Sequence, residues 1–218
     1  MITHEKKYYE FEDTFIKRNL TPSEYMINYE GHLVLPYKRI ERMKNEVAAI
    51  RYIQSHTTIP TPNIRCAFED HNRYYIVTDI VPGVTLAQIP DNKKAPIIKE
   101  LEGYRDQMHA IKSKVMGGLL GDMILPYRLT RKAPEHHETF REAETPEFVL
   151  CHNDLSQHNV LVDETSLKIN AIIDWEYAGF FPPEFDGKFY LRPGHSIALE
   201  GEEDDVSSLF EVLEYWKA

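Results

Sequence analysis

The chain has 218 residues, of which 42% are hydrophobic and 28% are charged; this balance is typical of a globular protein and excludes a disordered one. Its length suits one compact unit or two small lobes with a buried core. Its net charge of −10 argues against a nucleic acid as a partner, because such binding depends on neutralising phosphates.

Acidic residues are concentrated in the last third of the chain. Residues 1–134 contain 20 Lys and Arg against 16 Asp and Glu, whereas residues 135–218 contain 5 against 19. Such an excess attracts cations, so it favours magnesium or a cationic ligand near this part of the chain. The simpler interpretation is a solvated acidic surface at residues 200–205.

The cysteine content and the amino-terminal residues indicate the cellular compartment of the protein. Cys66 and Cys151 are too few for a disulfide framework and lack the spacing of a metal site. The first seven residues lack the apolar core of a signal peptide, and no apolar run reaches the length of a membrane span. We therefore expect a cytoplasmic protein with no membrane partner.

The first third of the chain predicts a small sheet with one helix. Turn residues separate runs of strand character, which cover residues 13–19, 31–37, 63–68 and 74–81. A helix is expected over residues 41–56, where apolar residues recur every three or four positions at Met43, Val47, Ile50 and Ile53. Strands and one helix thus precede Pro82-Gly83, which ends the sheet.

A longer helix is expected next, over about residues 95–115, with Ile97, Leu101, Tyr104, Met108 and Ile111 on one face. This order predicts two lobes, an amino-terminal one over residues 1–81 and a carboxy-terminal one over residues 82–218.

Residues 151–159 read Cys-His-Asn-Asp-Leu-Ser-Gln-His-Asn and form the most informative motif. The pattern is His-x-Asp, four residues and Asn, followed fifteen residues later by Asp174. In the catalytic loop of kinases this Asp accepts the proton of the substrate hydroxyl, while the Asn and the later Asp hold magnesium. Two apolar strands at residues 160–162 and 169–173 would form a β-hairpin with Asn159 before it and Asp174 after it. The spacing predicts that Asp154 is the general base and that Asn159 and Asp174 are metal ligands.

With His-Asn-Asp at residues 152–154 and Asp-Trp-Glu at 174–176, the chain resembles the aminoglycoside phosphotransferase family, most closely its fungal branch. The resemblance extends from about Phe11 to Asp205. It implies a bilobal α+β protein-kinase-like fold, with a small antiparallel sheet and one helix in the first lobe, and a mainly helical second lobe that carries the catalytic hairpin. It also implies transfer of a phosphoryl group from ATP or GTP, with Mg2+, to a hydroxyl of a small molecule. His152 would then hold the loop in shape, and Glu176 would reach a metal through water or position the loop.

The fold of this family also indicates where a nucleotide would bind. Glu46 lies mid-helix, where the partner of the phosphate-binding lysine is expected. Spacing slightly favours Lys38 as that lysine, while Lys17 lies in a better strand, and both stay open. The backbone of Asp79, Ile80 and Val81 would bond the base, with Thr78 behind it.

The near absence of glycine keeps a second interpretation open. The first 80 residues contain one glycine, Gly31, so no glycine-rich loop is available to cover the phosphates. The chain could therefore be a catalytically impaired, kinase-like nucleotide-binding module. A third interpretation, a metal-dependent hydrolase with His152, Asp154, His158 and Asp174 as ligands, leaves the first lobe unexplained.

Overall fold

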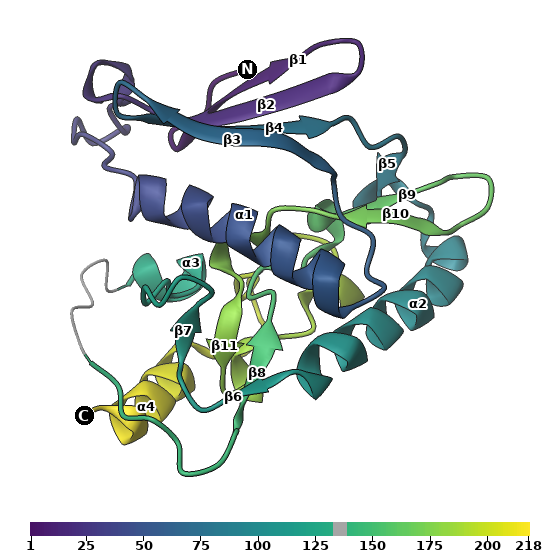
Figure 1. Ribbon diagram of the computed structural model, residues 1–218. Coiled ribbons are helices and arrows are strands. Elements are labelled where there is room, and N and C mark those ends of the chain that lie inside the picture. The colour runs from purple at the N-terminus through teal and green to yellow at the C-terminus, as the bar shows by residue number, and fades with distance from the viewer. Residues whose placement is uncertain (133–138) are drawn as a thin grey trace.

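The computed structural model describes residues 1–132 and 139–218, whose elements form an α+β fold (Figure 1). A four-stranded antiparallel sheet with the order β1-β2-β4-β3 forms one layer. Its strands are β1 (Lys6–Glu10), β2 (Thr14–Asn19), β3 (Ile64–Asp70) and β4 (Arg73–Asp79). Helix α1 (Arg39–His56) lies between this sheet and the rest of the molecule (Figure 1).

Helix α1 connects the sheet to the rest of the molecule because it is buried on both sides. Met43 and Val47 pack with Ile76 of β4. Further along the helix, Ala49, Ile50 and Ile53 belong to the largest core cluster, which includes residues from the second half of the chain. The helix predicted over residues 41–56 is confirmed, and it begins two residues earlier.

Besides six short 3-10 helices, the remaining described elements are three α-helices and two small antiparallel sheets. The sheets have the orders β10-β9-β5 and β6-β8-β11-β7. The helices are α2 (Asp91–Ala110), α3 (Tyr127–Thr130) and α4 (Val206–Trp216). The strands are β5 (Val84–Thr85), β6 (Lys112–Ser113), β7 (Gly117–Gly118), β8 (Phe148–Cys151), β9 (Val160–Val162), β10 (Ile169–Ile172) and β11 (Gly179–Phe181).

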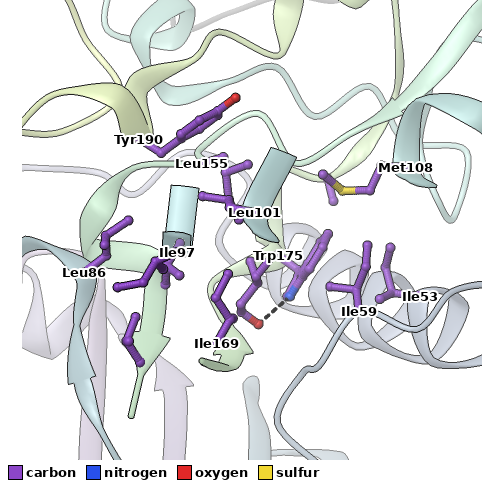
Figure 2. Close-up of a cluster of buried hydrophobic side chains, with 14 of the residues drawn as sticks. Ile53, Ile59, Leu86, Ile97, Leu101, Met108, Leu155, Ile169, Trp175 and Tyr190 are labelled. Atoms are coloured by element: carbon purple, nitrogen blue, oxygen red, sulfur yellow. Dashed lines mark hydrogen bonds between the residues drawn. The ribbon is translucent and has the colours of Figure 1, made fainter. Parts of the chain in front are cut away.

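The largest core cluster surrounds Trp175, which follows directly after Asp174 (Figure 2). The Trp175 side chain is fully buried, and its Nε1 donates a hydrogen bond to the carbonyl oxygen of Ile172 at 2.8 Å. Leu101 and Met108 of α2 pack in the same cluster. The core thus anchors the residue beside the second motif aspartate, which limits the positions that this aspartate can adopt.

Gly83 allows the chain to pass close to β9 after leaving the first sheet. Its φ is +121°, and a Cβ at this position would lie 2.5 Å from the carbonyl oxygen of Val162. Val84, the next residue, pairs with Val162 in the β5–β9 ladder. A larger residue at position 83 would push these strands apart. The boundary between lobes after residue 81 falls just before this contact, and the division into two lobes remains a prediction.

The strand predicted at residues 31–37 is wrong. An isolated bridge joins Ile27 and Leu33, and Asn28 Oδ1 closes the turn between them by accepting from the amides of Glu30 and His32. Leu33 and Leu35 are 54% and 69% exposed. An apolar run forms a regular strand only where a sheet edge is available to pair with it.

Strand β1 was not expected from the sequence, although it pairs with β2 along its whole length. The second predicted helix runs from Asp91 to Ala110 and includes Pro96. It ends earlier than expected because the next residues form β6, which pairs with β8. No helix within the described residues combines the length and the apolar character needed to span a membrane.

Candidate active site

The loop after β8 carries the first half of the motif. Asn153 has a left-handed backbone with φ 66°, which asparagine tolerates better than most residues. Its Nδ2 donates to the carbonyl oxygen of Tyr177 at 2.8 Å, and its amide nitrogen lies 3.5 Å from Asp186 Oδ1. The turn that presents Asp154 is therefore held by residues that follow Asp174 in the sequence.

His152 links the two halves of the motif. Its Nδ1 accepts from the amide of Asp154 at 3.2 Å, so Nε2 carries the proton and donates to the carbonyl oxygen of Ile173 at 3.0 Å. Burial lowers the pKa of His152, which keeps the ring neutral. Because both of its ring nitrogens are engaged, His152 is not available as a metal ligand for the hydrolase interpretation. The His158 ring stacks on His195, with the ring centres 4.8 Å apart.

Asp154 and Asn159 lie side by side. Asn159 Nδ2 donates to the backbone oxygen of Asp154 at 2.7 Å and to its Oδ2 at 3.1 Å. Because the amide nitrogen faces Asp154, the amide oxygen is directed away from it. Burial raises the pKa of Asp154 to about 7, although the Ser196 hydroxyl and the Asn159 amide beside it act in the opposite direction. A carboxyl group with a pKa near neutrality suits a general base.

The predicted hairpin is present and brings the two motif halves together. Val160 of β9 lies opposite Ile172 of β10, and the amide of Ile173 donates to the carbonyl oxygen of Asn159 at 3.0 Å. Asp174 follows with a left-handed backbone, φ 65°. Antiparallel pairing therefore delivers Asp174 to the same end of the hairpin as Asn159.

Two lysines from the first sheet surround Asp174. Its Oδ1 lies 3.3 Å from Lys17 Nζ and 4.0 Å from Lys6 Nζ. Burial alone would raise the pKa of Asp174, but the two ammonium groups outweigh it and hold this pKa below its ordinary value. The carboxylate is therefore ionised, as a metal ligand must be.

Lys17, and not the slightly favoured Lys38, reaches Glu46. Lys17 Nζ forms an ion pair with Glu46 Oε1 inside the fold. Lys38 instead precedes α1 with a left-handed backbone, φ 38°, and its Nζ lies 5.9 Å from the ring centre of Tyr37. Burial would lower the pKa of Lys17, but Glu46 and Asp174 outweigh it and raise this pKa, so the lysine stays charged.

A cavity of about 290 Å³ lies between the first sheet and the catalytic hairpin. Lys17, Glu46 and Asp174 line it together with the residues expected to contact a base, Thr78, Asp79, Ile80 and Val81. The amide of Asp79 already donates to the carbonyl oxygen of Asn63 at 3.0 Å, and the amide of Ile80 donates to the carbonyl oxygen of Asp13 at 3.2 Å. Among the three expected backbone amides, this leaves that of Val81 as the better donor to a base.

The charge cluster behind Asp174, formed by Lys6, Arg42 and Glu176, was not expected from the sequence. Lys6 Nζ lies 2.6 Å from Glu176 Oε1, and Arg42 of α1 lies 3.3 Å from the same oxygen. Asn45 of α1 donates to the carbonyl oxygens of Glu176 and Ala178. Alternation at Lys6, Tyr8 and Glu10 was the available signal, since a strand there would place all three on one face.

The residues present fit a magnesium ion bound together with a phosphate ligand. Asp174 supplies an ionised oxygen and Asn159 a neutral one, and Mg2+ characteristically uses one or two carboxylates together with substrate phosphates. Within residues 1–132 and 139–218, no group of three or more His, Cys, Asp or Glu side chains could hold a metal. Asp174 and Asn159 would therefore leave the other coordination positions of such an ion to phosphate and water oxygens.

Acidic residues near the start of α4 are largely paired. Arg192 contacts Glu202 at 2.8 Å, Arg128 contacts Asp205 at 3.1 Å, and Lys132 forms an ion pair with Asp204. These pairs reduce the negative field expected from the sequence. The solvated acidic surface is therefore the better description of this segment.

Comparison with protein families identifies the chain. The sequence profile of the phosphotransferase enzyme family, APH, matches residues 14–196, which include Lys17, Glu46, Asp154, Asn159 and Asp174. The chain belongs to this family. The phosphotransferase therefore acts on a hydroxyl group of a small molecule, as its motif predicted; its place within a fungal branch remains a prediction.

Solved structures confirm the fold of this phosphotransferase. A thermostable mutant of aminoglycoside phosphotransferase APH(4)-Ia, in ternary complex with AMP-PNP and hygromycin B, is similar at 17% identity and a TM-score of 0.51 over 84% of this chain and 70% of that chain. Aminoglycoside 3'-phosphotransferase of type VIII is similar at 15% identity and a TM-score of 0.55, over 96% and 86%. APH(3'')-Id from Streptomyces rimosus is similar at 13% identity and a TM-score of 0.52, over 82% and 73%.

At these identities the likeness establishes the fold alone, and the predicted protein-kinase-like α+β class is confirmed. No curated protein matches the chain.

Proposed function

We propose that this phosphotransferase transfers the terminal phosphoryl group of ATP or GTP, bound with Mg2+, to a hydroxyl of a small molecule. The observation that carries the proposal is the convergence of Lys17 from the first sheet and Asp174 from the catalytic hairpin on one cavity. Neighbouring structures were solved with AMP-PNP and with GDP, which supports a nucleotide ligand of this kind.

The proposal gives each candidate residue a role. Lys17, oriented by Glu46, binds the phosphates, while the backbone amide of Val81 contacts the base. Asn159 and Asp174 would hold the Mg2+, which supplies charge neutralisation for the phosphates when bound. Lys38 has no part in this assignment.

Asp154 acts on the acceptor. Its carboxylate accepts the hydroxyl proton as the acceptor oxygen bonds to phosphorus and the bond to the leaving nucleoside diphosphate breaks. His152 keeps Asp154 and Ile173 at a fixed separation through its two hydrogen bonds.

The acceptor is a small molecule with at least one hydroxyl group. A cationic acceptor has weak support, because arginine and lysine side chains already pair with much of the acidic segment. Solved relatives were crystallised with hygromycin B, which makes aminoglycosides one class to include in a screen.

The test has two arms. Melting temperature is measured with ATP and with GTP, each with and without Mg2+, since a ligand that binds the folded state raises it. Nucleotide consumption is then measured with a panel of hydroxyl compounds. We expect a shift that needs Mg2+ and turnover with at least one acceptor. Binding without any turnover would support the impaired binding module, which the lack of a glycine-rich loop favours.

A further inference from the structure

Lys6 occupies a buried position beside the metal-binding segment. It lies on β1 opposite Asn19, two residues from Tyr8, which lies opposite Lys17. Side chains alternate along a strand, so Lys6 and Tyr8 face the same side of the sheet. Lys6 is 3% exposed, and its Nζ lies 2.6 Å from Glu176 Oε1 and 4.0 Å from Asp174 Oδ1.

Glu176 is buried between two cations. Arg42 of α1 lies 3.3 Å from its Oε1, and Lys6 lies 2.6 Å from the same oxygen. The second oxygen of Glu176 is buried and has no hydrogen-bond partner among the described residues. This carboxylate therefore depends on Lys6 and Arg42 for compensation of its charge.

The ion pair between Lys6 and Glu176 affects which ligands Asp174 can bind. Without Lys6, the buried charge of Glu176 would be poorly compensated and would act on the phosphates beside Asp174. Without Glu176, the Lys6 ammonium group would have Asp174 as its remaining nearby acidic partner, and it would compete there with a metal cation.

We propose that Lys6 is a positioning residue of the metal site, and that its pairing with Glu176 limits how strongly either charge acts on ligands bound at Asp174. This inference deepens the proposed function and rests on it. It also gives Glu176 a role different from the expected water-mediated contact with a metal. Its pairing with Lys6 connects the first strand of the chain to the segment that holds the metal ligand.

The experiment compares Lys6→Met, Glu176→Gln and the double variant with Lys7→Met as the matched control. Lys7 is the adjacent residue, and it pairs with Glu24 at 3.6 Å instead of with the cluster. Mn2+ binding without nucleotide is followed by water-proton relaxation, and ATP binding at fixed Mg2+ is followed by calorimetry. Adenosine binding serves as the reference that involves no phosphate and no metal.

We expect Glu176→Gln to weaken Mn2+ and Mg-ATP binding by about 10-fold or more, as is typical when a group that supports a metal ligand is lost. Lys6→Met should weaken Mg-ATP binding by a similar factor without weakening Mn2+ binding, because the uncompensated Glu176 carboxylate repels phosphates and attracts a cation. The double variant should recover most of this loss, because neither unpaired charge remains. Lys6→Arg should bind like the unmutated protein, Lys7→Met should stay within about twofold of it, and adenosine binding should be unchanged in all variants.

Additive losses in the double variant, or a Lys6→Met protein that behaves like Lys7→Met, would overturn the inference. Equal loss of adenosine binding would also overturn it, because it would show a general structural role. If the unmutated protein binds Mn2+ but no nucleotide, the proposed function fails and the Mn2+ measurements still decide the role of Lys6. If it binds neither, both are overturned.

Discussion

Asp154 and Asp174 are both half-buried aspartates of one motif, yet their surroundings have opposite effects. Asp154 lies beside a hydroxyl and an amide, and burial raises its pKa to about 7. Asp174 lies beside Lys17 and Lys6, which hold its pKa below the ordinary value. Neighbouring charge therefore decides the protonation state more than burial does, and one residue type can serve as base and as metal ligand.

The neighbours of the two aspartates also come from different parts of the chain. Asn159 and Ser196, which lie beside Asp154, belong to the second half of the chain, as Asp154 does. Lys6 and Lys17 come from the first sheet. The state of Asp174 thus depends on contact between the first sheet and the catalytic hairpin, whereas that of Asp154 does not.

Asp174→Asn should have the largest effect, because it removes the ionised oxygen that would bind the metal and that Lys17 and Lys6 contact. We expect Mg2+-dependent ATP binding to fall by more than about 100-fold, since even groups that only support a metal ligand cost about 10- to 100-fold. Turnover should fall with it. Calorimetry at several Mg2+ concentrations measures the change, and ATP affinity that stays the same at every concentration would exclude Asp174 as a ligand.

Asp154→Asn should separate binding from transfer. Turnover should fall by about 10²- to 10⁴-fold, the usual loss of a general base, while ATP affinity is retained. In the unmutated protein, kcat/KM should rise as pH increases through about 7, because the base must be deprotonated. Intact turnover in the variant, or a flat pH profile between pH 5.5 and 8.5, would show that another group accepts the proton.

Although it should lower turnover, the same substitution should raise the stability of the folded protein at high pH. Because folding raises the pKa of Asp154 from 3.8 to about 7, its contribution to stability is fully present below pH 3.8 and is lost as pH rises through 7. Asparagine carries no charge, so Asp154→Asn should melt several degrees higher than the unmutated protein at pH 8 and no higher at pH 4. Melting curves at the two pH values test the sign.

Lys17→Met should have a smaller effect, and Lys38→Met is its control. Loss of a charge-assisted contact to a phosphate typically costs about 1.5–3 kcal/mol, which corresponds to about 10- to 100-fold in ATP affinity. Lys38→Met should change affinity by less than about twofold, because Lys38 lies at the start of α1 beside Tyr37. Calorimetry with ATP distinguishes the two lysines, and equal losses would contradict the assignment of Lys17.

The sequence by itself determined the catalytic loop, the hairpin behind it and the helix that carries Glu46. These features depend on local spacing: four residues separate Asp154 from Asn159, a short hairpin leads to Asp174, and apolar residues recur along α1. Local rules of this kind need no knowledge of distant segments. The fold class and the class of enzyme followed from the family that these motifs resemble.

Tertiary structure decided which distant residues meet at the motif. Lys17 and Lys38 were both acceptable by local criteria, and the pairing of β2 with β1 and β4 is what directs Lys17 to Glu46 and Asp174. The same pairing brings in Lys6, from a strand that the sequence did not indicate. The strand predicted at residues 31–37 is wrong for the converse reason: these residues pair with none of the described sheets. Ion pairs and sheet ladders join residues far apart in the chain, so only the folded arrangement fixes the charges around Asp174 and with them its low pKa.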